Sequence, residues 1–439
     1  MKLGSDMHHR GWMLGGLASI SAATLVLAGC SGNSSNSAIP TTDTGDCSTI
    51  TVLTNRTDQV DTNLAAEAKV FEKANPKVKV KIQGIADYAN DVRTRLNSKN
   101  YGDVLNIPQS ITPSQFPAFF TPLGSEASLS SKYHFTGNGS YEGQVYGISF
   151  AGLAGGLLIN TEVMKKAGIT EPPKTPAEFM SALQAIKAKT DAVPLYTNYH
   201  DGWPLQGWVM FDGLIKGADT YIDRTKSKSL YENGSELNVA GSILFDAVHD
   251  GLTEADPATT DWPTSLTMLA SGKIAVIPLA QFAVPQAQQA ATTAGLPASD
   301  IGFWPLPIQK DGKYQAQIVG DYQVAINKHS KCQATARKWV DFYLDESGFA
   351  NAIGEIPPLK TAKAPAILDE YTKLGVQYVE IAPSEKYQQL SKAAGLQFLA
   401  DPTILQKLID VARGAASGTK QSYFESLDAR WAQAVATNG

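Results

Sequence analysis

The chain has 439 residues, in which 37 Lys and Arg face 42 Asp and Glu, and its formal net charge is −5. This mild acidity, without a basic segment, argues against a nucleic-acid-binding protein. The length is typical of two lobes rather than one compact domain. After residue 29 no stretch is long and apolar enough to span a bilayer.

The N-terminus has the layout of a secretory signal. A basic start precedes the apolar run Trp12–Ala28, which is short for a membrane span. The run ends in Leu27-Ala28-Gly29-Cys30, which resembles the lipobox of a bacterial lipoprotein precursor. The resemblance implies removal of residues 1–29 and a lipid anchor on Cys30. The alternative is an uncleaved anchor helix.

Residues 30–46 are polar and of low complexity, so we expect a flexible tether. Two cysteines follow the tether. Cys47 precedes the first predicted strand, and Cys332 follows a late one. An exported protein meets an oxidising compartment, which is compatible with a Cys47–Cys332 disulfide. Two unpaired thiols are the alternative, and the sequence does not decide between them.

The first ordered segment alternates strands and helices. Strands are predicted at 50–53, 77–82 and 103–107, and the helix between the first two ends before Pro76. Strand 77–82 has lysine at every second position, which is typical of an edge strand. The β-α-β-α-β order predicts a parallel sheet with helices on both faces.

The same order of elements continues to the C-terminus, without a repeat of fixed period. Further strands are predicted at 155–160, 274–279, 301–306 and 322–326, and helices at 161–167, after Thr175, at 334–344 and from Ser384 onward. The pattern favours an α/β protein.

Several short motifs occur in a characteristic order along the chain. They include Tyr146-Gly147-Ile148-Ser149-Phe150, Gly272-Lys273-Ile274-Ala275-Val276, Gly302-Phe303-Trp304-Pro305 and Gly320-Asp321-Tyr322-Gln323-Val324. In this order the chain resembles the family 1 extracellular solute-binding proteins of ABC importers, the maltose-binding-protein class. Two motifs depart from the family pattern, since Gly320-Asp321 replaces Gly-Gly and Ala280-Gln281-Phe282 replaces Gly-Trp.

The resemblance implies a periplasmic-binding-protein-like fold of type II, with two α/β lobes around a ligand cleft and crossing hinge strands. Lobe I would comprise 47–150 plus 307–355, and lobe II 156–304 plus 360–439. A monomer of this class needs no cofactor and no metal. It captures a carbohydrate by hinge closure and delivers it to an ABC transporter permease at the outer face of the cell membrane.

Ligands of open α/β sheets bind at the carboxyl ends of strands, and sugars need aromatic platforms and paired polar groups. The candidates are therefore Arg56, Asp58, Gln109, Ser110, Asp201, Trp203, Gln281, Phe282, Trp304, Asp321 and Tyr322. The family positions support Gln281, Phe282, Asp321 and Tyr322. For the other candidates, an ordinary solvated turn, a helix cap or core packing explains the same residues.

Other functions remain open from the sequence. Gly147-Ile148-Ser149-Phe150-Ala151 lacks the last glycine of a hydrolase nucleophile elbow. The histidines after residue 29 are scattered, which argues against a metal centre. A polyamine binder would use Asp58, Asp201 and Asp321, whereas a phosphate-ester binder would need more cations than Arg56. The sequence favours carbohydrate.

Overall fold

The computed structural model describes residues 40–108, 110–259 and 261–438, all within one compact unit. The predicted signal, the lipidation of Cys30 and the candidate Gln109 lie outside the described residues. None of the described helices combines the length and the apolar character needed to cross a membrane.

A five-stranded sheet forms the centre of the first lobe. Its strands, in spatial order, are β2 (Lys79–Gly84), β1 (Thr49–Thr54), β3 (Val104–Asn106), β14 (Gln323–Ile326) and β7 (Gly147–Ser149). β1 lies parallel to β2 and β3, whereas β14 runs antiparallel to β3 and β7. β2 is an edge strand, as its alternating lysines predict.

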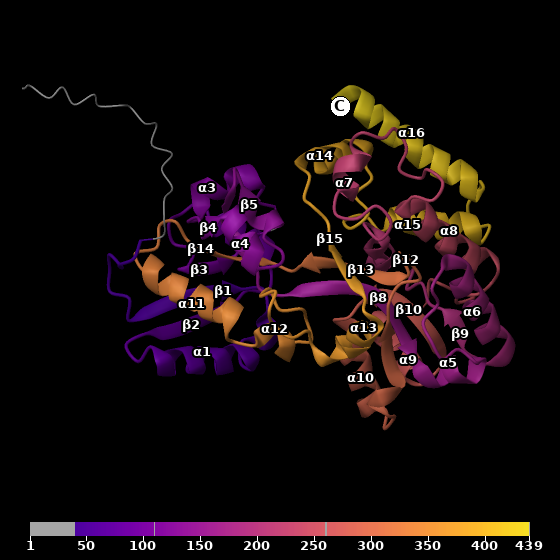
Figure 1. Ribbon diagram of the computed structural model, residues 1–439, viewed down its shortest axis with the longest axis horizontal. Coiled ribbons are helices and arrows are strands. Elements are labelled where there is room, and N and C mark those ends of the chain that lie inside the picture. Colours follow the sequence, from indigo (N-terminus) through magenta and orange to yellow (C-terminus); the bar gives the residue numbers. More distant parts are fainter. Residues whose placement is uncertain (1–39, 109, 260, 439) are drawn as a thin grey trace, which may run out of the picture. The chain divides into compact units, whose positions relative to one another are not determined.

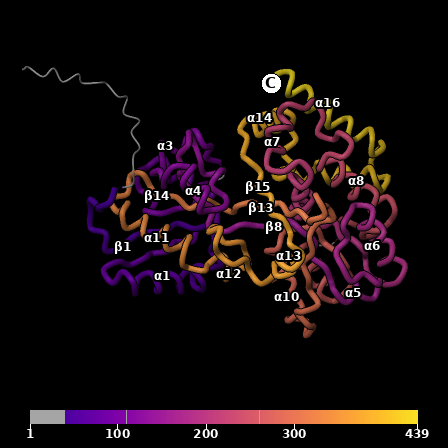
Figure 2. Tube along the Cα trace, in the orientation of Figure 1, coloured from indigo at the N-terminus to yellow at the C-terminus, as the bar shows by residue number. Residues whose placement is uncertain are grey.

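Helices cover both faces of this sheet, and segments far apart in the sequence lie side by side there (Figures 1 and 2). The helices are α1 (Asn63–Ala74), α2 (Tyr88–Arg95), α3 (Phe116–Phe119), α11 (Gln333–Asp345) and α12 (Phe349–Ala352). α1 buries Leu64, Ala68 and Phe71 at helical spacing. The ring of Phe71 meets Trp339 of α11 edge-on at 5.3 Å, so the two helices share one core.

A small three-stranded sheet and short helical turns complete this lobe. They are η1 (Thr57–Gln59), η2 (Pro113–Gln115), β4 (Gly124–Ser125), α4 (Glu126–Lys132), η3 (Gly137–Gly139), β5 (Ser140–Tyr141) and β6 (Gln144–Val145).

A seven-stranded sheet forms the centre of the second lobe. The strands, in spatial order, are β12 (Gln309–Lys310), β13 (Lys313–Gly320), β8 (Gly152–Asn160), β10 (Ile274–Ala280) and β9 (Val193–Leu195), with β11 (Ile301–Trp304) beside β8 and β15 (Gln377–Glu380) beside β13. β8 and β10 are buried along most of their length. Near-continuous apolar runs such as these are expected of strands covered on both faces.

The second lobe holds most of the helices. They are α5 (Thr161–Ala167), α6 (Pro176–Lys189), η4 (Trp203–Phe211), α7 (Thr220–Arg224), α8 (Glu236–His249), α9 (Trp262–Ala270), α10 (Ala283–Thr293), η5 (Ala298–Asp300), η6 (Ala366–Leu368), α13 (Asp369–Leu374), α14 (Glu385–Ala394), α15 (Thr403–Ala412) and α16 (Lys420–Asn438). The start of α6 follows the predicted cap, because Thr175 Oγ1 accepts a hydrogen bond from Glu178 N at 3.2 Å.

The pairing of β13 differs from the lobe boundaries that we inferred. Residues 307–320 were assigned to lobe I, but β13 pairs with β8 from Ile318 to Gly320 and with β15 along Gln315–Ile318. Strand pairing depends on neighbours distant in the sequence, so local pattern could not assign β13 to a sheet. By this pairing the first lobe resumes only after Gly320.

The end of the predicted tether contacts the first lobe. Asp43 Oδ1 accepts hydrogen bonds from Ala334 N and Thr335 N, at 2.9 and 3.2 Å, and so caps α11. Thr44 N donates to Lys331 O at 2.8 Å. Ordered structure therefore begins before Cys47, because a carboxylate in the polar segment satisfies the free amides at the start of a helix.

The structure also brings the two cysteines together. Cys47, just before β1, forms a disulfide with Cys332, just before α11, across a sequence separation of 285 residues. The bridge connects the first strand of the lobe to its last long helix.

Three chain segments cross between the two sheets and are hydrogen-bonded to one another. Asp321 N donates to Ala151 O at 2.9 Å, which joins the β13–β14 connection to the β7–β8 connection. Gly152 exchanges two backbone hydrogen bonds of 2.8 Å with Ile356, from the segment after α12. These short crossings are the places where a hinge motion between the lobes would bend.

Gly207 allows η4 to lie directly on β10. A β-carbon at this position would sit 2.1 Å from the carbonyl oxygen of Pro278, a backbone atom that cannot move aside. We expect Gly207→Ala to lower the free energy of unfolding by about 1–3 kcal/mol through overpacking. Urea unfolding followed by circular dichroism measures this change. An unchanged midpoint and slope would contradict the close packing of η4 on β10.

Candidate ligand-binding cleft

A cavity of about 920 Å³ lies between the two lobes. The first lobe contributes Ile107, Pro108, Ile111, Thr112, Pro113, Phe116, Glu126, Gly137, Asn138, Ser140, Tyr141 and Glu142. The crossing segment contributes Val319–Gln323, and the second lobe Leu153, Gln206, Gly207, Met210, Leu279, Ala280, Phe282, Pro383, Glu385, Gln388, Leu399 and Ala400. The volume is at the upper end of the range for small-molecule sites.

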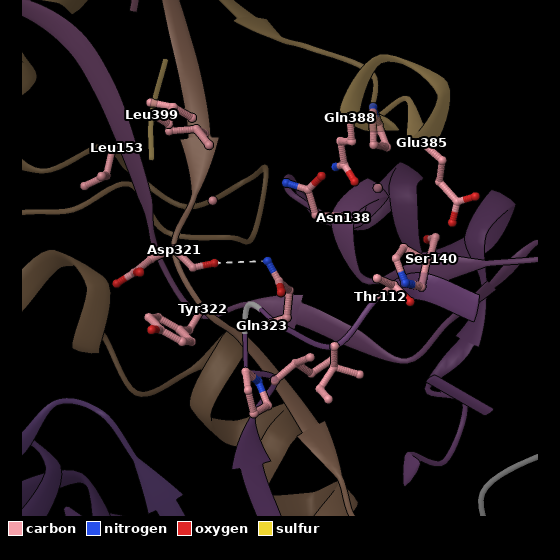
Figure 3. Close-up of a pocket in the computed structure, with 18 of the residues that line it drawn as sticks. Thr112, Asn138, Ser140, Leu153, Asp321, Tyr322, Gln323, Glu385, Gln388 and Leu399 are labelled. Atoms are coloured by element: carbon pink, nitrogen blue, oxygen red, sulfur yellow. Dashed lines mark hydrogen bonds between the residues drawn. The ribbon is translucent and has the colours of Figure 1, made fainter. Parts of the chain in front are cut away.

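The lining combines flat aromatic rings with side-chain amides. Phe282, Tyr322 and Tyr141 supply rings, and Asn138, Gln206, Gln323 and Gln388 supply groups that both donate and accept hydrogen bonds. Figure 3 shows polar side chains from both lobes around this space, with Gln323 Nε2 donating to the Asp321 carbonyl oxygen at 3.3 Å. This combination suits a ligand with apolar faces and many hydroxyls.

Among the described residues, the charged side chains that line the cavity are all acidic. Glu126, Glu142, Asp321 and Glu385 line it, and none of its described lining residues is Lys, Arg or His. Burial raises the pKa of Asp321, against the opposing effect of a backbone hydrogen bond and the Arg56 charge. A cavity with these groups would repel an anionic ligand.

Three of the predicted ligand contacts line the cavity. They are Phe282 at the start of α10 and Asp321 and Tyr322 on the crossing segment. Tyr322 is held from behind by Tyr88, whose ring meets it edge-on at 5.9 Å. Whether these side chains touch a ligand stays a prediction.

Gln281, predicted as a ligand contact, does not line the cavity. It is completely buried, its Oε1 accepts from Ala154 N at 2.5 Å, and its Nε2 donates to Gly152 O at 3.0 Å. A polar side chain in an apolar interior must find partners there. Gln281 therefore holds the start of β8 at the crossing.

Asp201 and Trp203 lie behind the cavity wall. Asp201 Oδ2 accepts from Trp262 N at 2.6 Å, at the start of α9. Trp203 packs edge-on against Trp262, with ring centroids 5.1 Å apart, and against Phe282 at 6.3 Å. The cluster of aromatic and polar residues seen in the sequence thus supports Phe282 from behind.

Trp304 and Ser110 are also absent from the lining. Trp304 packs on the core of the second lobe, and its carbonyl accepts from Tyr371 Oη at 3.1 Å. Ser110 is exposed, although Ile111 and Thr112 beside it line the cavity. Core packing explains Trp304, and Ser110 is an ordinary exposed turn residue, because the cap of η2 is Thr112.

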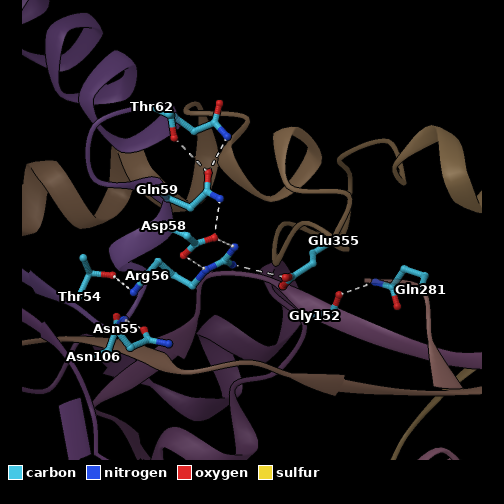
Figure 4. Close-up of polar contacts among 11 residues, drawn as sticks. Thr54, Asn55, Arg56, Asp58, Gln59, Thr62, Asn106, Gly152, Gln281 and Glu355 are labelled. Carbon is cyan, nitrogen blue, oxygen red and sulfur yellow. Dashed lines mark hydrogen bonds and ion pairs between the residues drawn. The ribbon is translucent and has the colours of Figure 1, made fainter. Parts of the chain in front are cut away.

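Arg56 and Asp58 belong to a separate ionic cluster beside the crossing segments (Figure 4). The Arg56 guanidinium binds both oxygens of Asp58, at 3.0 and 2.9 Å, and lies 3.5 Å from Glu355 Oε1. The hydrogen bonds from Arg56 lower the pKa of Asp58 to about 2. Two lobe-I segments, the turn after β1 and the stretch after α12, are joined by this cluster.

Glu355 is the unusual member of the cluster. It is 6% exposed, and its Oε2 has no hydrogen-bond partner among the described residues. Burial raises its pKa to about 8, the negative charge of Asp321 adds to this, and Arg56 only partly opposes it. A protonated Glu355 at neutral pH follows from this environment.

Several cavity residues escaped the sequence analysis. Asn138, Gln206 and Gln388 lie on helical turns rather than after strands, so the rule about strand ends does not select them. Gln388 reaches the cavity only because α14 folds back from the C-terminal part of the chain. The sequence could have indicated Gln323, because this residue directly follows the predicted contacts Asp321 and Tyr322.

Comparisons with known proteins agree with this architecture. Residues 55–348 match the family model for the bacterial extracellular solute-binding protein. The multiple sugar-binding protein of Streptococcus mutans is 26% identical over 304 residues, which cover 66% of this chain and 69% of that protein.

Two solved structures from Bifidobacterium animalis subsp. lactis are similar over 89% of this chain and 95% of theirs. One is an ABC-transporter binding protein in complex with mannobiose, with 31% identity and a TM-score of 0.76. The other is a manno-oligosaccharide-specific solute-binding protein in complex with mannotriose, with 30% identity and a TM-score of 0.75. They confirm the predicted fold of two α/β lobes around a cleft.

These matches decide between binding protein and enzyme, since the family and the similar structures are solute-binding proteins rather than hydrolases. The family is extracellular, which agrees with the secretory layout of the N-terminus. The chain belongs to the bacterial extracellular solute-binding protein family.

Proposed function

We propose that this protein captures a neutral oligosaccharide, of the size of mannobiose or mannotriose, in the cavity between its lobes. The observation that carries the proposal is the lining of rings and amides without a described cationic residue. It disfavours a phosphate ester, and the similar structures with bound mannobiose and mannotriose support a neutral sugar.

The finer parts of the proposal concern transport. The lobes close on the sugar by bending at the three crossing segments, and a permease accepts the closed form. A lipid on Cys30 holds the protein at the outer face of the membrane. The motif Leu27-Ala28-Gly29-Cys30 supports this anchor, and two acyl chains are enough for stable attachment. Mass spectrometry of the membrane-bound protein would detect the acylated cysteine.

A polyamine is the second candidate ligand. Four carboxylates line the cavity without a described cation to neutralise them, which suits a small cation. The amides and rings favour the sugar, because a polyamine has no hydroxyls and no flat apolar face.

Removal of the cavity rings should weaken sugar binding. We expect Phe282→Ala and Tyr322→Ala each to weaken mannotriose binding about tenfold or more, since each loses a stacking surface worth roughly 1.4 kcal/mol or more. The shift in melting temperature on adding mannotriose reports the loss. Tyr378→Ala, a half-buried ring on β15 outside the cavity, is the control. Equal shifts in all four proteins would place the sugar elsewhere.

A further inference from the structure

A second cavity lies at the opposite end of the first sheet from the ligand-binding cleft. Ile107, after β3, and Gln323, at the start of β14, line the cleft. Asp103, before β3, and the residues after β14 line the second cavity, whose volume is about 600 Å³. Its full lining is Thr51, Leu53, Lys81, Gln83, Arg95, Lys99, Asn100, Gly102, Asp103, Asn327, His329, Ser330, Lys331 and Cys332. We call it the basic pocket.

The basic pocket collects cations that have no carboxylate partner. Lys81, Arg95, Lys99 and Lys331 line it, and none of them forms an ion pair with a described residue. The one carboxylate in the lining, Asp103, is already engaged with other groups. Its Oδ2 accepts from Thr51 N at 2.8 Å and its Oδ1 from Ser330 Oγ at 2.5 Å.

Lys81, Lys99 and Lys331 are exposed, so these unpaired cations are open to a ligand from the solvent. Like charges around a concave surface repel one another, and the low-dielectric walls focus their field on the space between them. An anion with several acceptor oxygens relieves the repulsion. A phosphate group matches the set, because arginine binds it in a planar fork and lysines bind it as point charges.

The position of the N-terminal segment indicates where the phosphate comes from. Thr44 N bonds to the carbonyl of Lys331, and Cys47 is bridged to Cys332, so the chain approaches the domain at the rim of the basic pocket. Thr44 stands 14 positions after Cys30, which limits the distance between them to about 50 Å. If Cys30 is lipidated, the rim of the pocket at Lys331, which Thr44 contacts, stays within about this distance of the head groups.

The charge of the whole chain makes the local cations more significant. The net charge of −5 disfavours contact between an average surface of this protein and an anionic membrane. A local cluster of cations selects one face for that contact, and each Lys or Arg near an anionic surface adds to the attraction. The lysine alternation noted in strand 77–82 thereby has a role at Lys81.

We propose that the basic pocket binds the phosphate groups of anionic phospholipids and holds the first lobe against the membrane. This inference rests on the proposed lipid anchor for its biological setting. Binding itself does not require the anchor, so the two ideas can fail separately. The bound orientation leaves the ligand-binding cleft at the far end of the sheet open to solutes.

The test uses the unlipidated compact unit, residues 38–439, and vesicles of phosphatidylcholine with or without 30% phosphatidylglycerol. We expect sedimentation with the anionic vesicles only, and release when the salt is raised to about 0.5 M. Lys99→Glu/Lys331→Glu should weaken this binding at least tenfold. Lys166→Glu/Lys392→Glu changes the charge equally at exposed sites of the second lobe, and should retain most of the binding.

Two results would overturn the proposal. One is no binding to the anionic vesicles, and the other is equal loss in both double variants. In the first case, inorganic phosphate that raises the melting temperature of the wild type, but not of Lys99→Glu/Lys331→Glu, would show that the pocket holds free phosphate instead. Mannotriose binding, measured on the same proteins, should be unchanged in both variants. If the wild type itself does not bind mannotriose, that result counts against the proposed function and not against the basic pocket.

Discussion

Replacing Cys47 and Cys332 together with serine is expected to lower the free energy of unfolding by about 3–5 kcal/mol. The bridge spans a sequence separation of 285 residues, and the entropy that a crosslink removes from the unfolded chain grows with the loop that it closes. The effect should be large because the loop contains the whole central part of the chain. The bridge also holds β1 next to α11, whose Trp339 is buried in the core of the first lobe.

Guanidinium unfolding of the oxidised wild type, the reduced wild type and the double serine variant measures this effect. The variant should resemble the reduced wild type and should not respond to reductant. Thiol counting on the unfolded, unreduced wild type should find neither cysteine free. Equal stability of the oxidised and reduced wild type would contradict a bridge at these positions.

The free energy of unfolding of the wild type is expected to fall as the pH rises from about 4.5 to 8, and Glu355→Gln is expected to abolish this fall. The folded pKa of Glu355 is raised to about 8 from an ordinary value of 4.5. The protonated form is therefore favoured by folding, and its contribution is complete below pH 4.5 and is lost as the pH rises toward 8. Glutamine imitates the protonated acid at every pH, so the variant should be more stable than the wild type at pH 9 by a few kcal/mol.

The surroundings of Glu355 explain the sign. Arg56 is 3.5 Å away, but it is already bound to Asp58, and Asp321 adds a second negative charge to the cluster. Chemical unfolding at pH 5, 7 and 9 should give the wild type and Glu355→Gln similar free energies of unfolding at pH 5, and a higher value for the variant at pH 9. Glu232→Gln, at an exposed position of the second lobe, should behave as the wild type. A gap that is the same at all three pH values would mean that Glu355 is ionised throughout.

Local pattern in the sequence predicted many elements of the fold but not their long-range neighbours. The apolar run of β1, the alternating lysines of β2 and the capped start of α6 depend on nearby residues, and the structure contains all three. The pairing of β13 with β8, the cap that Asp43 forms on α11 and the contact of Arg56 with Glu355 join residues far apart in the sequence. No local rule identifies such partners.

The site shows the same division. Phe282 follows the predicted strand 274–279, so the rule about strand ends selects it. Asp321 and Tyr322 stand at the start of the predicted strand 322–326 and were selected by the family resemblance. All three residues line the cavity. The same rule selected Gln281, which points into the protein and satisfies backbone groups of β8. The direction of a side chain after a strand depends on the packing around it, which one sequence does not reveal.

The central claim is that a neutral oligosaccharide binds in the cavity between the lobes. The most direct test is a calorimetric titration of the protein with three ligands. Mannobiose, spermidine and a sugar phosphate represent the neutral, cationic and anionic alternatives. The lining of the cavity predicts saturable binding of one mannobiose per chain, much weaker binding of spermidine and no binding of the sugar phosphate. Tight binding of spermidine or of the sugar phosphate, with no heat from mannobiose, would contradict the claim and leave only the fold in place.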